Sequence, residues 1–205
     1  MRPPYDQMLT WPNVLTLLRI SLVPLLVILF YLPFKWAHTS SAFVFAVASV
    51  TDWLDGYLAR YLKQTTKLGA FLDPVADKLM VSVALVLLVA EPTFRSIDAN
   101  SSEISIPTLF ITIPAGIIVA RELIVSALRE WMSEIGKRTS VAVSTVGKFK
   151  TAVQMLALII LLYCDHTAPI LLILTGYILL YVAAILTVWS MCVYLKAAWK
   201  QLIST

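Results

Sequence analysis

Six apolar stretches in this 205-residue sequence are each long enough to cross a lipid bilayer as a helix. A spanning helix needs about 20 residues. Charged residues make up only 14% of the chain and hydrophobic residues 60%, whereas a water-soluble domain has about a quarter charged residues. The sequence therefore predicts an all-α integral membrane protein with six transmembrane helices, in one domain over residues 1–205. The stretches are Asn13–Leu32, Ser40–Leu62, Leu68–Val89, Ile106–Met132, Gly147–Cys164 and Ile170–Lys196.

Basic residues concentrate on one side of these predicted helices. Lysines and arginines follow the second, fourth and sixth stretches, whereas the opposite loops carry Glu91, Asp98, Glu103 and Asp165. Cytoplasmic loops are enriched in Lys and Arg, so we expect both termini in the cytoplasm. Residues 1–9 lack the apolar core of a signal peptide, so we expect the first stretch to be retained. The net charge of +4 is explained by this anchoring and does not indicate nucleic acid as a partner.

Four aspartates inside or beside the second and third stretches are the exception to this apolar pattern. A carboxylate at bilayer depth costs at least about 2–3 kcal/mol, and Arg60, Lys67 and Lys78 are too few and too scattered to neutralise four. A structural ion-pair network is the alternative, but it would need more bases. Carboxylate oxygens in this number suit Mg²⁺ or Mn²⁺. The aspartates are Asp52, Asp55, Asp73 and Asp77.

Their spacing places these acids on one side of each helix, together with small residues. Successive helical residues are rotated by about 100°, so positions three or four apart share a face. Two helices joined by a short loop are expected to be antiparallel neighbours, which would bring both faces together near the cytoplasm. The small residues would let a ligand approach the backbone. The sets are Asp52, Asp55, Gly56 and Ala59 on the second helix, and Gly69, Asp73 and Asp77 on the third.

Pro74 leaves two readings of the third helix open. Proline kinks a helix when it lies in the interior, and it is favoured in the first turn. In the second case Asp73 would be the N-cap. Either arrangement would help to turn Asp73 into the site.

Together these residues resemble the motif of the CDP-alcohol phosphatidyltransferase family, and every fixed position matches. The resemblance covers the whole chain, because the fold of that family is itself six transmembrane helices. The motif reads Asp52-x2-Asp55-Gly56-x2-Ala59-Arg60-x8-Gly69-x3-Asp73-x3-Asp77.

Three other segments resemble one bacterial branch of this family. That branch transfers a phosphatidyl group from CDP-diacylglycerol to sn-glycerol 3-phosphate and releases CMP. The resemblance implies a transferase of phosphatidylglycerol biosynthesis in the bacterial inner membrane, with its site facing the cytoplasm; a homodimer is compatible with the family. The segments are Pro12-Asn13-x2-Thr16-x2-Arg19, Arg121-Glu122-x3-Ser126-x2-Arg129-Glu130 and Gly147-Lys148-x-Lys150-Thr151.

The resemblance also implies roles for the motif. Two divalent cations, Mg²⁺ or Mn²⁺, would lie about 4 Å apart, and Asp77 would be both a metal ligand and the general base. Arg60 could contact the donor phosphate or hold an aspartate, and Asn13 could reach the diphosphate or cap the first helix. The implied metal ligands are Asp52, Asp55, Asp73 and Asp77, and the implied CDP-diacylglycerol contacts are Asn13, Asp52, Asp55, Gly56, Ala59, Arg60, Gly69 and Asp73.

The phosphate of glycerol 3-phosphate needs fixed cations. Arg121 and Glu122 lie within the fourth stretch, where a charge is expensive. Glu122 and Arg129 share one side of this helix and could pair, which leaves Arg121 as the expected phosphate ligand.

The basic residues of the fifth stretch and of the loop before it complete this prediction. Lys148 and Lys150 are about 200° apart on a helix, so only one is expected to face the pocket, and we expect Lys148. Lys137 is expected to assist, although simple anchoring explains Lys137 and Arg138 equally well.

Two other functions compete with this interpretation. The same cations would accept another phosphorylated alcohol such as inositol phosphate. Acids in membrane helices also occur in divalent-cation transporters. A transporter is disfavoured because the acids cluster near one face and do not continue towards the other.

Overall fold

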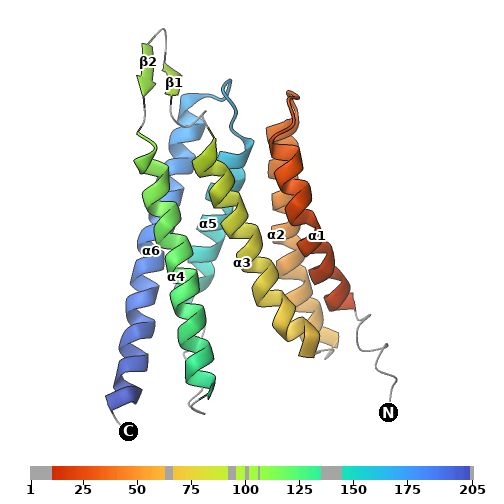
Figure 1. Cartoon of the computed structure of the whole chain (residues 1–205), viewed down its shortest axis with the longest axis vertical. Coiled ribbons are helices and arrows are strands. Elements are labelled where there is room, and N and C mark those ends of the chain that lie inside the picture. The colour runs from red at the N-terminus through yellow and green to blue at the C-terminus, as the bar shows by residue number, and fades with distance from the viewer. Residues whose placement is uncertain are drawn as a thin grey trace. The chain divides into compact units, whose positions relative to one another are not determined.

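The computed structural model describes residues 11–62, 67–91, 96–99, 102–105, 107–134 and 145–203. Within these ranges the chain forms six helices and one short hairpin (Figure 1). The helices coincide with the six predicted stretches to within a few residues at most ends, which confirms the helix predictions. They are α1 (Trp11–Phe30), α2 (Ala37–Leu62), α3 (Lys67–Ala90), α4 (Leu109–Glu134), α5 (Thr145–Tyr163) and α6 (Ile170–Ile203), and the strands are β1 (Ser96–Ala99) and β2 (Ser102–Ser105).

The hairpin was not predicted, because the sequence interpretation treated this segment as a plain connection. The two strands pair antiparallel, with Ser96 opposite Ser105 and Ile97 opposite Ile104. Four residues on each strand are too few for an alternating pattern to stand out from a polar loop.

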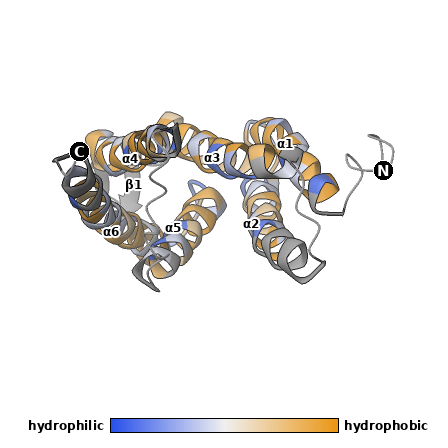
Figure 2. Cartoon of the chain, turned by 90° about the horizontal axis from the view of Figure 1, so that it is seen from below, coloured by the Kyte–Doolittle hydropathy of each residue, from blue (hydrophilic) through white to orange (hydrophobic). Residues whose placement is uncertain are grey.

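The described helices are strongly apolar, and apolar residues (orange) recur all along them in Figure 2. In the part of the chain that the structure describes, three helices are long and apolar enough to cross a membrane: α1, α4 and α6. An apolar segment of α5, Phe149–Tyr163, is shorter. Helices α2 and α3 have 26 and 24 residues but carry the acidic residues. This composition, together with exposed side chains such as Phe43 and Leu171, is that of a protein surrounded by lipid.

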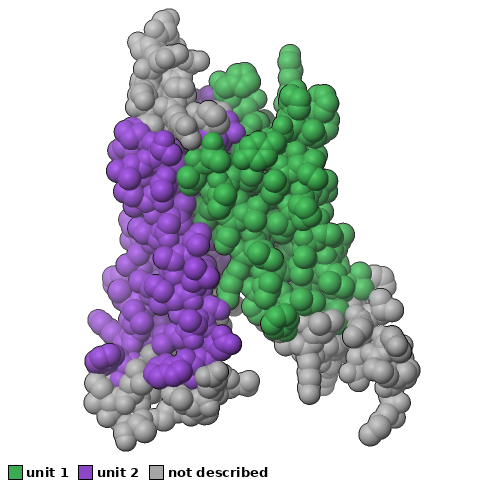
Figure 3. Space-filling view, in the orientation of Figure 1, with its two compact units in different colours: residues 1–90, 162–167 green, residues 91–161, 168–205 purple. Residues whose placement is uncertain are grey.

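The chain divides into two compact units, which are coloured separately in Figure 3. Unit 1 comprises residues 1–90 and 162–167, and unit 2 comprises residues 91–161 and 168–205. In unit 1, α1 packs against both α2 and α3 (Figures 1 and 2). The sequence predicted direct pairing of α2 with α3; among the described residues, the extensive packing runs through α1 instead.

Pro74 lies in the interior of α3, because this helix begins at Lys67. The reading of Asp73 as an N-cap is therefore wrong. Interior prolines also occur at Pro24 in α1 and Pro114 in α4. Membrane helices tolerate them because neighbouring groups can satisfy the freed carbonyl.

In unit 2, α4 packs against α6, and α6 approaches α5 closely at Gly176. A Cβ atom at Gly176 would lie 2.6 Å from Cδ2 of Leu161. The missing side chain therefore lets the two helices approach, as small residues do at membrane helix interfaces.

Candidate active site

Helix α1 holds one aspartate from each of its two neighbours. Arg19 Nη1 donates a hydrogen bond to Oδ1 of Asp52 on α2 and forms an ion pair with it. Thr16 Oγ1 donates to Oδ1 of Asp73 on α3 at 2.5 Å. Thr16 and Arg19 are three residues apart, so they lie on the same side of α1. The structure thus brings the acids of α2 and α3 together through a third helix.

The polar side of α1 continues to Asn13, three residues before Thr16. Asn13, Thr16 and Arg19 have exposed fractions of 1%, 0% and 1%, although α1 is otherwise one of the most apolar segments. Asn13 lies inside α1, which begins at Trp11, so the helix-cap alternative is wrong. Three buried polar residues at intervals of three are costly in a membrane helix unless they have partners. Their arrangement is therefore consistent with a functional role for this side of α1.

The structure describes the side chains of only some of the remaining motif residues. Gly69 is buried, and Asp73 and Asp77 are half-buried one turn apart on α3. Asp55, Gly56, Ala59 and Arg60 belong to α2, but their side chains lie outside the described part of the structure. The predicted contacts of these four residues with CDP-diacylglycerol stay predictions.

The donor chemistry of unit 1 fits a hard divalent cation. Asp52 and Asp73 each use Oδ1 to accept the bond from α1, and a carboxylate has a second oxygen that can ligate a metal. Asp77 adds a third carboxylate one turn beyond Asp73. Oxygen ligands of this kind suit Mg²⁺ or Mn²⁺. No group of three or more candidate metal-ligating side chains occurs among those that the structure describes, a set that does not include Asp55.

A second polar cluster, in unit 2, joins α4, α5 and α6. Oε1 of Glu122 accepts hydrogen bonds from Arg121 Nη1 at 2.8 Å and from Lys150 Nζ at 3.0 Å. Arg121 Nη2 also donates to Oγ of Ser190 at 3.0 Å. Two cations share one carboxylate, so these three charged groups carry one surplus positive charge in largely apolar helices. A surplus of this sign favours an anionic ligand.

Three buried polar atoms beside this cluster have no hydrogen-bond partner among the described residues: Arg121 Nε, Gln154 Oε1 and Thr187 Oγ1. Gln154 lies one turn after Lys150, and Thr187 lies one turn before Ser190. An unsatisfied buried polar group costs about 1–3 kcal/mol. A polar ligand that reached these atoms would remove that cost.

Arg121 is in the cluster, as expected of a phosphate ligand, but its surroundings differ from the prediction. Glu122 bonds to Arg121 and Lys150. The pair with Arg129 that the sequence left open is not tested, because the side chain of Arg129 lies outside the described set. Lys150 is only 4% exposed and faces the cluster. The side chain of Lys148 and the whole of Lys137 and Arg138 lie outside the described residues, so their predicted role stays a prediction.

Sequence reasoning missed Thr16, Arg19, Lys150 and Ser190 as members of these sites. Thr16 and Arg19 enter the sequence analysis only as parts of matching segments, and Lys150 was considered there but set aside in favour of Lys148. An arginine in the middle of an apolar helix, with polar residues at intervals of three before it, was a signal that could have been used. The sequence holds no comparable signal for Ser190, because a single serine in a membrane helix usually bonds to the backbone of its own helix. Ser190 also does this, since its Oγ donates to the carbonyl oxygen of Thr187 at 3.0 Å.

The chain belongs to the CDP-alcohol phosphatidyltransferase family, whose model matches residues 9–189 and so runs through both units. This confirms the prediction made from the motif. The chain is 53% identical to the CDP-diacylglycerol–glycerol-3-phosphate 3-phosphatidyltransferase of Yersinia enterocolitica, over 94% of this chain and 96% of the relative. Relatives of the same name from Sodalis glossinidius and Pseudomonas fluorescens are 56% and 52% identical, over 91% and 93% of this chain and 93% and 91% of those relatives.

Proposed function

We propose that this protein transfers the phosphatidyl group of CDP-diacylglycerol to sn-glycerol 3-phosphate, giving phosphatidylglycerophosphate and CMP. The observation that carries the proposal is the 53% identity, over nearly the full length of both chains, to a relative named for this reaction. The acid cluster of unit 1 and the cation cluster of unit 2 support it, because the reaction needs both a metal-bound diphosphate and a bound anionic acceptor.

On the donor side, Asp52, Asp55, Asp73 and Asp77 would hold two Mg²⁺ or Mn²⁺ ions. Bound there, such ions would neutralise the diphosphate and lower the pKa of the attacking hydroxyl. Arg19 and Thr16 fix the carboxylates of Asp52 and Asp73, so these acids are positioned before substrate arrives. The small residues Gly56, Ala59 and Gly69 admit the cytidine and its phosphates, with Asn13 and Arg60 as polar contacts.

Asp77 is the general base. It takes the proton from the primary hydroxyl of glycerol 3-phosphate, and the oxygen forms a bond to the lipid-bearing phosphorus. The bond from that phosphorus to the oxygen of CMP breaks, and CMP leaves with the electron pair. The displacement is direct, because the motif offers no Ser, Cys or His to form a covalent intermediate.

On the acceptor side, Arg121 binds the phosphate. Lys148 and Lys137 were the lysines proposed from the sequence, and the buried position of Lys150 adds it as a third candidate. The hydrogen bonds from Arg121 to Glu122 and Ser190 hold the guanidinium in place. A guanidinium fixed in this way loses less entropy when it binds a phosphate.

We propose six membrane spans, with both termini and the acids on the cytoplasmic side of the bacterial inner membrane, in one family domain. The lengths of α2 and α3 and the basic loops support this topology. Cysteines introduced at Ser133 and at Ser101, after replacement of Cys164 and Cys192 by alanine, test it. A membrane-impermeant thiol reagent should label the Ser133→Cys variant only from the cytoplasm and the Ser101→Cys variant only from outside; reversed labelling would contradict the topology.

The reaction itself is tested by CMP release from purified protein supplied with CDP-diacylglycerol and Mg²⁺ or Mn²⁺. Glycerol 3-phosphate should support release, whereas inositol phosphate and serine should support far less. Preferred use of inositol phosphate would change the assigned acceptor. No CMP release with any alcohol would favour the cation-transport alternative.

A further inference from the structure

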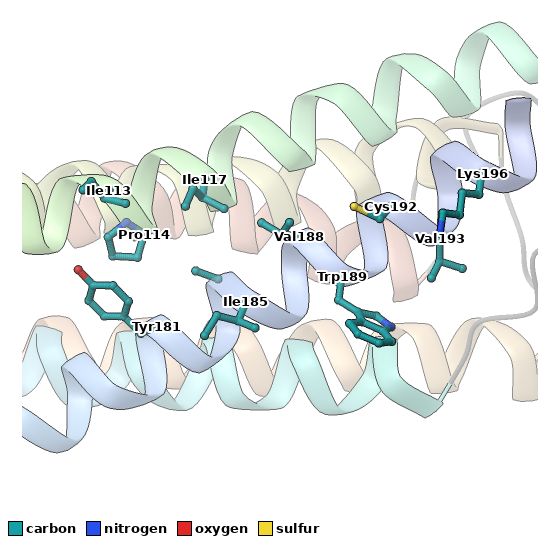
Figure 4. A pocket seen from close by; sticks show the side chains of 11 residues that line it. Ile113, Pro114, Ile117, Tyr181, Ile185, Val188, Trp189, Cys192, Val193 and Lys196 are labelled. Atoms are coloured by element: carbon teal, nitrogen blue, oxygen red, sulfur yellow. The ribbon is translucent and has the colours of Figure 1, made fainter.

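An apolar groove of about 520 Å³ lies between α4 and α6 in unit 2 (Figure 4). This volume is within the range of about 300–1,000 Å³ that is usual for ligand sites. Ile117 of α4 and Ile185 and Val188 of α6 line its walls, and Lys196 lines one end. Pro114 and Ala184 also line it, and their compact side chains leave room between the two helices.

The groove follows one side of α6 over at least the depth of one membrane leaflet. Tyr181, Ile185, Cys192 and Lys196 recur at intervals of four and seven residues, so they form one stripe on this helix. From Tyr181 to Lys196 the helix rises about 22 Å. One leaflet of a bilayer has a hydrocarbon thickness of about 15 Å. The groove therefore extends from the lysine at the end of the apolar span, Ile170–Lys196, through the depth of one leaflet.

The chemistry of the lining matches a lipid better than a second protein chain. Membrane helix interfaces are enriched in small residues that let backbones approach, whereas Trp189, Ile185 and Val188 present large side chains here. Trp189 is 68% exposed and lies two turns before Lys196 on the same stripe. Lys196 ends the apolar span, and a lysine at a span end lies at the level of the lipid headgroups. The ammonium of Lys196 complements a phosphate.

We propose that this groove binds one acyl chain of an anionic glycerophospholipid from the surrounding bilayer, with the headgroup phosphate paired to the Lys196 ammonium. The site uses none of the residues placed in the donor or acceptor machinery, so it goes beyond the transfer reaction. A ligand that binds only the folded chain stabilises it by mass action. The bound lipid therefore couples the stability of this protein to the anionic lipid content of its membrane.

The test is lipid retention by the purified full-length protein, measured by native mass spectrometry in detergent with phosphatidylglycerol or phosphatidylcholine of the same acyl chains. One lysine at a membrane surface contributes about 1 kcal/mol towards an anionic lipid, which is about a fivefold preference. Wild-type protein should retain phosphatidylglycerol with about this preference. Lys196→Gln should abolish it and Lys196→Arg should keep it, while Lys35→Gln, which removes an exposed lysine outside the groove, should change nothing.

A second pair of variants tests the acyl chain. Cys192→Trp places a large ring in the groove and should reduce retention of both lipids, whereas Leu195→Trp, on the same helix outside the groove, should not. Unchanged retention in a folded Cys192→Trp protein would overturn the proposal. A wild-type dimer that lacks bound lipid and dissociates in Cys192→Trp would also overturn the proposal, because the groove would then bind a second copy of the chain. So would a severalfold rise of the KM for CDP-diacylglycerol in Lys196→Gln with lipid retention unchanged, because the groove would then serve the donor.

Discussion

The polar clusters of the two units have opposite charge balances. Among the side chains that the structure describes in unit 1, Arg19 faces Asp52, while Asp73 is held by the neutral hydroxyl of Thr16. In unit 2 Arg121 and Lys150 share the one carboxylate of Glu122. Charges in apolar helices are costly unless compensated, so neither imbalance is expected of a purely structural network. This difference supports the proposal that unit 1 binds divalent cations and unit 2 an anionic acceptor.

The largest expected effect concerns the acid cluster of unit 1. Asp77→Asn removes the proposed base and one metal ligand, so turnover should fall by at least about 10²–10⁴-fold, the usual contribution of a general base. CMP release by purified protein measures it. Asp165→Asn, a matched change in the loop between α5 and α6, should leave turnover unchanged. Near-normal release by Asp77→Asn would remove Asp77 from the mechanism.

The next effect concerns the unit 2 cluster. Charge-assisted hydrogen bonds are worth about 1.5–3 kcal/mol, so Arg121→Ala and Lys150→Ala should each raise the KM for glycerol 3-phosphate by about tenfold to a hundredfold. The KM for CDP-diacylglycerol should change much less. Steady-state kinetics with each substrate varied in turn provide the measurement.

Lys148→Ala sharpens the same experiment, because it decides which lysine serves the acceptor. If Lys148→Ala raises the KM for glycerol 3-phosphate more than Lys150→Ala does, Lys148 is the lysine that binds the acceptor, as the sequence predicts. If the donor KM rose and the acceptor KM did not, the cation cluster would belong to the other substrate.

A smaller effect is expected on stability in unit 1. Arg19→Ala leaves Asp52 without its cation and opens a cavity at a buried position, but Asp52 is 38% exposed, so water can solvate it. We expect the free energy of unfolding to fall by about 2 kcal/mol, below the about 3–5 kcal/mol of a fully buried pair. Thermal unfolding in detergent measures this, with Arg19→Lys expected to recover part of the loss. Equal stability of Arg19→Ala and wild type would show that the pair does not hold α1 to α2.

The smallest effect comes from a carboxylate outside both clusters. The Thr167 hydroxyl and backbone N–H donate to Oδ1 of Asp165 at 2.7 and 2.8 Å, and these bonds hold the pKa of this carboxyl below its ordinary value. A lowered pKa contributes stability above the unfolded-state pKa of about 3.9, and this contribution is lost as the pH falls through the folded-state value. The melting temperature of wild type should therefore decrease slightly more than that of Asp165→Asn between about pH 5 and about pH 3; parallel curves would contradict this.

The sequence alone determined the helices and the family. An apolar stretch of about 20 residues crosses a membrane as a helix, because a helix satisfies its own backbone hydrogen bonds. The motif acids follow from local spacing, since residues three or four apart share a helix face whatever the rest of the fold does.

Only the tertiary structure decided the partners of these residues. Arg19 and Asp52 are 33 positions apart, and Thr16 and Asp73 are 57 apart. The sequence placed α2 against α3, whereas α1 packs against both and supplies the hydrogen bonds. Likewise Lys150 meets Glu122 across 28 positions and Ser190 meets Arg121 across 69. No periodicity within one helix records which neighbour will face it, because that depends on the packing of all the helices at once.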